Sequence, residues 1–274
     1  MTYLVTGTSS GIGRATAVRL AEHGHDVVAG VRKIADAPVH PRIRPVELDV
    51  TDADQLAAVA KDVGPLRGLV NNAGVTVSAP VEHIPLDRLR AQFEVNVVGV
   101  VAVCQAFLPA VRAGGGRLVM ISSSSGRVAI PQVGAYSASK FAVEALSDAL
   151  RRELRPWTVP VVVVEPGNFQ SRNRASTEIA AEADRMTMGE TAERQYGPAM
   201  DAYLEFSRKE QTRAGAPERV AAVVERALTA KRPRPRYQVG GDAHLLVALS
   251  RVLPVRAMDA LLVRSIGLPR RPPN

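Results

Sequence analysis

Short apolar runs alternate with longer stretches of helical periodicity over the first two-thirds of the chain. The runs predicted to be strands are Tyr3–Thr6, Asp26–Gly30, Val46–Val50, Gly68–Asn71, Arg117–Ser122 and Val159–Glu165. The predicted helices between them are Gly13–His23, a segment from an N-cap at Thr51 to about Val63, Leu86–Arg112 and Tyr136–Leu154. Val-rich strands separated by helices are typical of a parallel sheet that is covered on both faces. Because crossovers between parallel strands are right-handed, the pattern predicts an α/β fold with a doubly wound, Rossmann-type sheet.

The last third of the chain is less regular. Residues 170–215 are polar and mixed, and two short amphipathic patterns follow around His244–Leu253 and Arg256–Ile266. We expect a single domain, in which residues 1–240 form the Rossmann-fold body and residues 241–274 form a helical extension of it.

The net charge is concentrated near the C-terminal end. The formal charge is +8, and residues 207–274 hold 14 Lys and Arg residues against 5 Asp and Glu residues. We favour a solvated basic tail, with contact to an anionic membrane surface or a polyanionic partner as the alternative. Because the sequence has neither a basic stripe interleaved with aromatic residues nor zinc-finger spacing, no nucleic-acid partner is expected.

Other features restrict the location and the chemistry. No segment has the roughly 18 unbroken apolar residues of a membrane span. The chain enters a strand-like run at once, without the pattern of a signal peptide, so we expect a cytoplasmic protein. Cys104 is the only cysteine, which excludes an intrachain disulfide, and we expect it in the core. The 5 histidines show no ligand spacing, so no metal site is predicted.

A glycine-rich turn follows the first predicted strand. Residues 6–13 read TGTSSGIG, which gives the spacing G-x-x-x-G-x-G. Glycines let backbone N–H groups approach a pyrophosphate closely, and the following helix directs its positive end at the anion. Between the strand and the helix of a βαβ unit, such a turn predicts a dinucleotide site.

Four motifs in order resemble those of one family. TGTSSGIG is followed by NNAG at residues 71–74, YSASK at residues 136–140 and Pro166-Gly167. Over about residues 1–170 the chain therefore resembles the classical short-chain dehydrogenases/reductases. The resemblance implies a bound nicotinamide dinucleotide. It assigns cofactor contacts to Gly7, Ser9, Ser10, Gly11, Ile12, Gly13, Val50, Asn72, Ala73, Gly74, Pro166, Gly167, Phe169 and Ser171.

The end of the second predicted strand distinguishes between two cofactors. An NAD site usually carries an acidic residue there, whereas this chain has Arg32 and Lys33. A guanidinium binds a 2′-phosphate through paired charged hydrogen bonds, so we predict NADP(H), with Arg32 as the main contact and NAD as the alternative. Asp49 resembles the family residue that meets the adenine ring, and its other possible role is in the turn before Thr51.

Tyr136 and Lys140 are four residues apart in a predicted helix and therefore share one face. A tyrosine alone has a pKa of about 10, and a neighbouring ammonium lowers that pKa because it favours the phenolate. Tyr136 would then donate a proton to a carbonyl oxygen in reduction and remove a proton from an alcohol in oxidation. The resemblance adds that Lys140 bonds the nicotinamide ribose and that both side chains contact the cofactor.

Two further site residues rest on the resemblance. Ser122–Ser125 are four serines in a row, and the family's usual separation from the tyrosine selects Ser123 to bond the substrate oxygen. Asn96 lies inside a predicted helix, although asparagine is a poor helix former. Its role in the family is to hold, through its backbone, a water that links Lys140 to solvent.

The loop Glu165–Phe169 (EPGNF) and the extended C-terminus look similar to the hydroxysteroid and retinol dehydrogenase branch, which implies an apolar alcohol or carbonyl substrate. In the same loop, Ser171 replaces the usual threonine. We expect residues 170–215 to form a flexible lid over the substrate. Its large residues either give it an apolar underside or pack it onto the body; they are Met186, Met188, Tyr196, Met200, Tyr203 and Phe206. The family also implies a homodimer or homotetramer through the two long helices.

Two other function classes fit parts of the sequence. A nucleotide-sugar epimerase or dehydratase also uses YxxxK, but its first turn resembles G-x-x-G-x-x-G and its chain is usually longer. A non-catalytic NADP(H)-binding sensor would lack the tyrosine, the lysine or the serine, all of which are present here. We therefore predict an NADP(H)-dependent oxidoreductase that acts on CH–OH groups.

Overall fold

The protein is built around a parallel sheet with the strand order β3-β2-β1-β4-β5-β6-β7. The computed structural model describes residues 1–170, 172–186 and 188–269, except the side chains of residues 172–176. The strands are β1 Thr2–Thr6, β2 Asp26–Val31, β3 Ile43–Glu47, β4 Gly68–Asn71, β5 Leu118–Ile121, β6 Val161–Pro166 and β7 Arg236–Val239. Every neighbouring pair of these strands is parallel, which confirms the predicted α/β fold with a Rossmann-type sheet.

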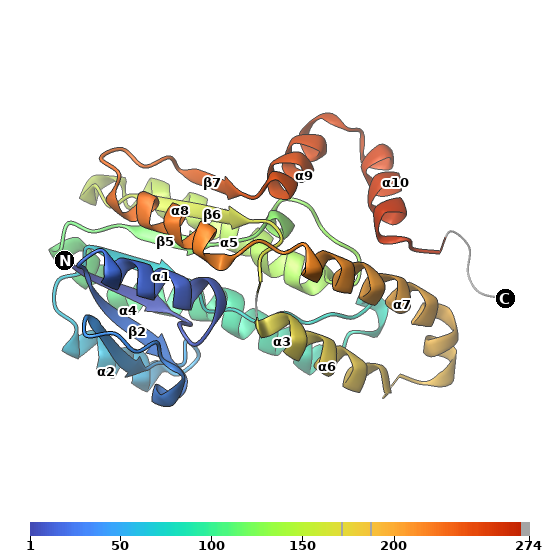
Figure 1. Ribbon diagram of the computed structural model, residues 1–274, viewed down its shortest axis with the longest axis horizontal. Helices are drawn as coiled ribbons and strands as arrows, with labels where there is room; N and C mark the ends of the chain where they lie inside the picture. The colour runs from blue at the N-terminus through green and yellow to red at the C-terminus, as the bar shows by residue number, and fades with distance from the viewer. Residues whose placement is uncertain (171, 187, 270–274) are drawn as a thin grey trace.

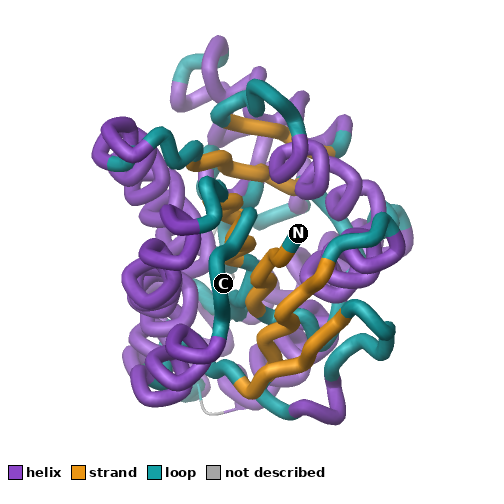
Figure 2. Tube along the Cα trace, turned by 90° about the vertical axis from the view of Figure 1, so that its left-hand side faces the viewer, coloured by secondary structure: helices purple, strands orange, loops and turns teal. Residues whose placement is uncertain are grey.

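Helices cover both faces of the sheet (Figures 1 and 2). The α-helices of the described residues are α1 Gly11–Glu22, α2 Ala53–Asp62, α3 Leu86–Phe93, α4 Gly99–Ala113, α5 Gly134–Glu153, α6 Arg172–Met186, α7 Glu190–Thr212, α8 Pro217–Thr229, α9 Gly241–Val252 and α10 Val255–Ile266. Because successive strand residues point to opposite faces, Leu4 packs with Phe107 of α4, while Val5 packs with Leu20 of α1 and Val224 of α8. The result is two apolar layers with the sheet between them.

The strand order reverses between β1 and β4, and this reversal positions the site. At such a switch point the loops that leave neighbouring strands diverge, which opens a crevice at the carboxyl ends of the strands. The loop after β1 carries TGTSSGIG and the loop after β4 carries NNAG, so the fold brings these two motifs to one edge. Helices α6, α7, α9 and α10 gather beyond the same edge (Figure 1).

The third strand is displaced from its predicted position. The prediction was Val46–Val50, whereas β3 covers Ile43–Glu47 and includes Pro45. Proline has no N–H to donate, but β3 is an edge strand, where a missing donor is tolerated.

The start of α2 also differs from the prediction. Asp52 rather than Thr51 caps the helix, because its Oδ1 accepts hydrogen bonds from the N–H groups of Asp54 and Gln55, each at 3.0 Å. Thr51 instead donates its N–H and its hydroxyl to Oδ1 of Asp49.

The long helix predicted over Leu86–Arg112 is interrupted by a π-helical turn, η3, at Glu94–Val98. By length and composition alone, the helical stretch Leu86–Ala113 could cross a membrane, although 44% of its most apolar window is buried. Phe107 and Val111 of this stretch are fully buried in the core, so packing against the sheet accounts for its apolar character.

Several elements of the second half were not predicted. The segment 170–215, expected as a mixed lid, contains the two helices α6 and α7. Helix α8, which packs on α1, and edge strand β7 have no counterpart in the prediction. Pro233 and Pro235 interrupt the pattern just before β7, so that strand was not recognised. The two amphipathic patterns near the C-terminus are confirmed as α9 and α10.

Cys104 packs in the core. Its side chain is 2% exposed, and burial raises the pKa of the thiol to about 12. Nδ2 of Asn71 lies 3.2 Å from the sulfur. A thiol that stays protonated is a poor nucleophile, so Cys104 is a packing residue, as predicted.

Candidate active site

A cavity of about 810 Å³ opens at the carboxyl edge of the sheet. The predicted site residues that line it are Gly7, Ser9, Ser10, Gly11, Ile12, Arg32, Asp49, Val50, Asn72, Ala73, Gly74, Ser123, Tyr136, Lys140, Pro166, Gly167 and Phe169. Gly13 and Asn96 lie behind this lining, and Ser171 is outside the described residues. Most of the predicted site, drawn from the segments that follow six of the strands and from α5, therefore faces one space.

The turn after β1 requires its glycines for two different reasons. Gly7 and Gly11 have φ angles of +69° and +55°, a region that side chains rarely adopt. At Gly13, an added Cβ would lie 2.2 Å from the carbonyl oxygen of Gly7 and 2.4 Å from Nδ2 of Asn72. Gly13 thus allows α1 to pack closely behind the turn, while Gly7 and Gly11 shape the surface that faces the cavity.

Hydrogen bonds between the loops after β1 and β4 fix this surface. The hydroxyl of Thr6 accepts from the N–H groups of Asn72 and Ala73 at 3.0 and 3.1 Å. Nδ2 of Asn72 donates to the carbonyl oxygens of Thr6 and Gly7 at 2.9 and 3.0 Å. The asparagine therefore holds the glycine-rich turn in place, a structural role that adds to its predicted contact with the cofactor.

Arg32 and Asp49 stand at one end of the cavity, after β2 and β3. Arg32 is exposed, and no acidic partner is found for it within the described part of the chain. Asp49 is half-buried, and its Oδ1 accepts the hydroxyl of Thr51 at 2.7 Å. The turn role that the sequence allowed for Asp49 is thus present, while the side chain still borders the cavity.

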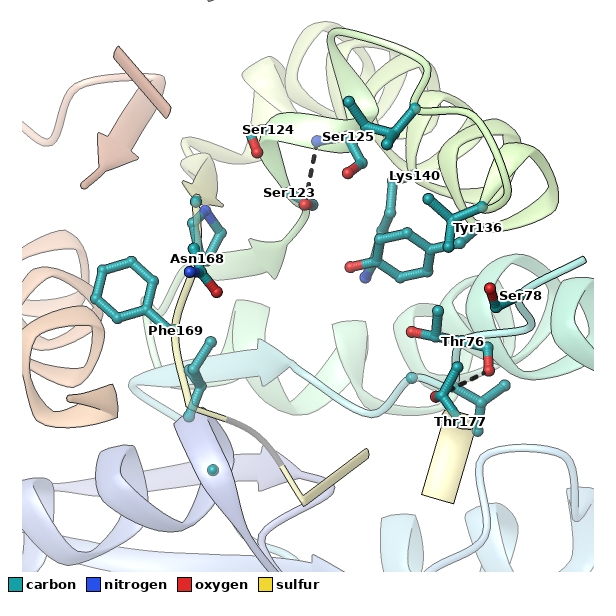
Figure 3. Close-up of a pocket in the computed structure, with 18 of the residues that line it drawn as sticks. Thr76, Ser78, Ser123, Ser124, Ser125, Tyr136, Lys140, Asn168, Phe169 and Thr177 are labelled. Carbon is teal, nitrogen blue, oxygen red and sulfur yellow. Dashed lines mark hydrogen bonds between the residues drawn. The ribbon is translucent and has the colours of Figure 1, made fainter. Parts of the chain in front are cut away.

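Ser123, Tyr136 and Lys140 meet at the middle of the cavity wall. Figure 3 shows the hydroxyl groups of Ser123 and Tyr136 pointing into the same space. Ser123 comes from the loop after β5, where its Oγ accepts the N–H of Ser125 at 3.1 Å. Nζ of Lys140, one turn after Tyr136 on α5, lies 5.8 Å from the centre of the tyrosine ring. The helical spacing therefore brings the two side chains to one face, as predicted.

Lys140 is buried, with only 6% of its surface exposed. Its Nζ donates a hydrogen bond to the carbonyl oxygen of Ile121 at 2.8 Å. Burial disfavours the ammonium and lowers the pKa of Lys140 to about 8, although the carboxylate of Glu144 opposes this effect. The lysine can therefore exchange a proton near neutral pH.

Asn96 is fully buried on the π turn η3. Its Oδ1 accepts the N–H of Val75 at 2.8 Å, and its Nδ2 donates to the carbonyl oxygen of Val75 and to Oγ of Ser139 at 2.9 and 3.0 Å. The side chain thus joins the loop after β4 to α5. A π turn shifts the backbone out of the regular α-helical register, which is compatible with the backbone role that the resemblance implies.

The loop after β6 is tied to the start of α9. Oδ2 of Asp242 accepts the N–H of Asn168 at 2.6 Å, and a Cβ on Gly167 would lie 2.2 Å from the same oxygen. Nδ2 of Asn168 also donates to the carbonyl oxygen of Glu210 on α7. Sequence analysis found Gly167 but not Asp242 or Asn168, because the partner residues are remote in the chain and belong to no motif.

The far end of the cavity is largely apolar. Two of the predicted lid residues, Tyr203 and Phe206, line it, whereas Met200 is buried away from it and Met186 is 84% exposed. Helices α9 and α10 contribute a wall that consists of Leu245, Leu246, Leu249, Leu261, Leu262, Ser265 and Ile266. The amphipathic pattern of these helices was visible in the sequence, but nothing in the pattern indicated that their apolar faces border the site.

Comparison with known proteins gives consistent matches. A family model described as short chain dehydrogenase matches residues 1–182. Retinol dehydrogenase 5 of Mus musculus is 37% identical over 94% of this chain and 86% of its own. The NADPH-dependent 3-dehydrocapnine reductase of Ornithobacterium rhinotracheale is 34% identical over 96% of both chains. A crystal structure of a short chain dehydrogenase from Burkholderia cenocepacia J2315 in complex with NADP superposes with a TM-score of 0.76, at 28% identity, and covers 96% of this chain and 97% of that one.

Proposed function

The chain belongs to the short-chain dehydrogenase family and is an oxidoreductase for alcohol or carbonyl groups, and we propose that it interconverts an apolar secondary alcohol and its ketone, or an aldehyde, with NADP(H). The observation that carries this proposal is the convergence of the Ser123 and Tyr136 hydroxyl groups on one space beside buried Lys140 (Figure 3). That space is continuous with the glycine-rich turn on one side and the apolar wall on the other.

The glycine-rich turn fits a dinucleotide. An added Cβ on Gly7 would lie 2.8 Å from the Cα of Ala73, so the turn packs closely against the backbone of the loop after β4 and has no room for a side chain at this position. The start of α1 offers N–H groups and a positive dipole end to a pyrophosphate. When bound, a nicotinamide dinucleotide supplies or accepts the hydride. Arg32 would hold a 2′-phosphate and favour NADP(H) over NAD(H), as expected for a guanidinium that directly follows β2 and has no acidic partner among the described residues.

The protein's own residues handle the proton. Ser123 would donate a hydrogen bond to the substrate oxygen and hold it beside the Tyr136 hydroxyl. In reduction Tyr136 gives its proton to that oxygen, and in oxidation it takes the proton back. The Lys140 ammonium, 5.8 Å from the centre of the tyrosine ring, stabilises the phenolate between these events. Asn96 keeps the loop after β4 and helix α5 in register, so Lys140 retains its place.

An apolar substrate is supported by the wall that α9 and α10 add to the cavity. Burying alkyl surface against such a wall contributes roughly 25 cal/mol per Å², so an extended apolar substrate gains far more than a small polar one. Two relatives are named as a retinol dehydrogenase and as an NADPH-dependent 3-dehydrocapnine reductase, which agrees with a reaction at an alcohol or carbonyl group.

Two rival functions are less well supported. A non-catalytic sensor does not require the serine, tyrosine and lysine to converge on the cavity. A nucleotide-sugar epimerase or dehydratase needs room and polar partners for a second nucleotide, whereas the far end of this cavity is lined by Leu246, Leu249 and Leu262.

We also propose a homodimer or homotetramer through the long helices. Val98, the residue immediately before α4, is 51% exposed, and Phe141 on α5 is 44% exposed. Large apolar side chains left open on helices are common at interfaces between subunits.

A substrate panel tests the proposed function. Long-chain aliphatic ketones, steroid ketones, aldehydes and small polar ketones are supplied with NADPH or NADH, and the absorbance of the reduced nicotinamide is followed. We expect turnover with extended apolar carbonyl compounds, at higher kcat/KM with NADPH than with NADH. Turnover only with small polar ketones would contradict the substrate class, and NADH preference would contradict the cofactor.

A further inference from the structure

The charged residues that the outer helices contribute to the cavity lining are all acidic. Glu178 on α6, Glu210 on α7 and Asp242 on α9 come from the helices that gather beyond the edge of the sheet (Figure 1). The cations of the lining come from the body of the fold, because Arg32 directly follows β2 and Lys140 belongs to α5. Within the described part of these outer helices, no lysine or arginine lines the cavity.

Two of the three carboxylates have partners within the protein. Oδ2 of Asp242 accepts the N–H of Asn168 at 2.6 Å. Oε2 of Glu210 accepts Nδ2 of Asn168 at 3.2 Å, and its Oε1 lies 3.7 Å from Nη1 of Arg213. These contacts hold the loop after β6 against α7 and α9, so the structure itself accounts for Glu210 and Asp242.

Glu178 has a weaker set of contacts. Its side chain is half-buried, and its Oε1 accepts the hydroxyl of Ser207 at 3.3 Å. Among the described side chains, no ammonium or guanidinium forms an ion pair with it. A hydroxyl compensates a carboxylate that has lost part of its hydration less well than a cation does. Glu178 therefore borders the cavity with a charge that could be paired by a bound molecule.

The segment that carries Glu178 is fixed near the proton-transfer residues. Thr177, the preceding residue on α6, donates its hydroxyl to the carbonyl oxygen of Thr76 at 3.2 Å. Thr76 belongs to the segment after β4, and Figure 3 shows Thr76 and Thr177 on the side of the cavity where Tyr136 lies. This contact holds the part of α6 next to Glu178 in the wall of the substrate space.

Ser207 connects Glu178 to the apolar part of the lining. It is 7% exposed, lies one turn after Tyr203 on α7 and directly follows Phe206, and all three residues line the cavity. Residues three and four positions apart share one face of a helix. This face of α7 therefore presents two aromatic rings beside the hydroxyl that binds Glu178. A charge next to such a surface acts more strongly than it would in bulk water.

We propose that Glu178 binds a protonated amine, so that the substrate is an apolar ketone or alcohol that also carries an amino group. The inference rests on the proposed function, because it assigns one part of the substrate of that reaction. The ammonium would pair with Glu178, while the alkyl part packs on Leu249 and Leu262 of the apolar wall. A carboxylate or phosphate on the substrate would instead be repelled by the acidic side chains of the lining.

The test compares pairs of ketones that have the same shape and differ in charge. One member of each pair carries a dimethylamino group and the other an isopropyl group at the same position, and the position is varied from the γ-carbon outward. Both are supplied with NADPH to the full-length protein. We expect kcat/KM to be roughly 10- to 100-fold higher for the best dimethylamino ketone than for its isopropyl counterpart, because the hydrogen bond to Glu178 is charge-assisted.

Two variants assign this preference to one side chain. Glu178→Gln keeps the size of the side chain and removes its charge, so the ratio of the two kcat/KM values should fall to about one. Glu182→Gln is the matched control, because Glu182 lies one turn further along α6, is exposed and does not line the cavity. It should keep the ratio of the wild type.

A binding measurement separates this inference from the proposed function. Alkyl chains without a carbonyl group, ending in the dimethylamino or the isopropyl group, are titrated calorimetrically into the protein in the presence of NADPH. We expect the wild type and Glu182→Gln to bind the amine more tightly than its isopropyl counterpart. Glu178→Gln should bind the two compounds equally.

Each outcome supports or overturns the inference. Equal kcat/KM for both members of every pair in the wild type overturns it and leaves the proposed function standing. A preference that persists in Glu178→Gln, or that is lost equally in Glu182→Gln, also overturns it. If no ketone is reduced but the amine binds more tightly to the wild type than to Glu178→Gln, the amine site stands and the proposed function fails.

Discussion

At the residue scale, the ammonium of Lys140 has a proposed role in proton transfer, and its burial lowers the stability of the folded protein. The pKa of Lys140 is about 8 in the folded protein, against 10.5 for an ordinary lysine. Between these values the unfolded chain binds more protons than the folded one, so stability rises with pH through this window. Below pH 8 the buried charge is retained and its cost is present in full.

The first prediction concerns the removal of this charge. Lys140→Met should abolish turnover yet raise the free energy of unfolding by about 2 kcal/mol at pH 7, after allowance for the lost hydrogen bond to Ile121. The gain over the wild type should shrink as pH rises from about 8 to 10.5. Chemical denaturation at several pH values measures it, and a variant less stable than the wild type at pH 7 would contradict the burial argument.

Arg32 provides the second prediction at this scale. Arg32→Asp replaces the cation that we propose holds the 2′-phosphate with an anion, so it should weaken NADPH binding by roughly 10- to 100-fold and NADH binding much less. Lys33→Asp, which changes charge by the same amount at the next residue, is the control and should have a smaller effect. Fluorescence titration of both nucleotides measures the change, and equal losses for NADPH and NADH in Arg32→Asp would refute the 2′-phosphate contact.

At the element scale, α9 and α10 add an apolar wall to the cavity at the carboxyl edge of the sheet, where we propose that the substrate binds. Helix α9 is tied to the loop after β6, because Asp242 at the start of α9 accepts the N–H of Asn168. Leu249 and Leu262 then face the cavity from the two helices. Under the proposed function, substrate selection thus depends on elements outside the four motifs.

The wall gives a third prediction. Leu262→Ser should raise KM for an extended apolar ketone by roughly tenfold, because burial of one such side chain contributes about 1.5–3 kcal/mol. The KM for a small ketone should be nearly unchanged. Ala260→Ser on the exposed face of α10 is the matched control. An equal rise of KM for both ketones would show that the wall does not contact the substrate.

At the scale of the whole molecule, the fourth prediction is oligomeric state. Light scattering after size-exclusion chromatography should give a dimer or tetramer, and Phe141→Asp on α5 should shift it toward the monomer while NADPH binding persists. A monomeric wild type at micromolar concentration would remove the proposal that the long helices form the interface.

A feature was predictable from the sequence when the residues that determine it lie close together along the chain. The sheet was predictable because each strand and helix carries its own periodicity, and Tyr136 and Lys140 were predictable because one helical turn relates them. Strand β7 pairs with β6, Asp242 accepts the N–H of Asn168, and Arg236 contacts Glu144 and Glu165. Each of these contacts joins residues that are far apart in the chain. Local patterns contain no information about such pairs. Pro233 and Pro235, just before β7, are unfavourable in a strand and did not indicate one.

The most direct test of the central claim compares carbonyl-dependent NADPH oxidation by the wild type and Tyr136→Phe, with NADPH binding measured in parallel. We predict that the variant binds NADPH nearly as tightly as the wild type but loses turnover by at least about 100-fold, since it can no longer transfer the proton. Turnover at the wild-type rate in Tyr136→Phe would contradict the account.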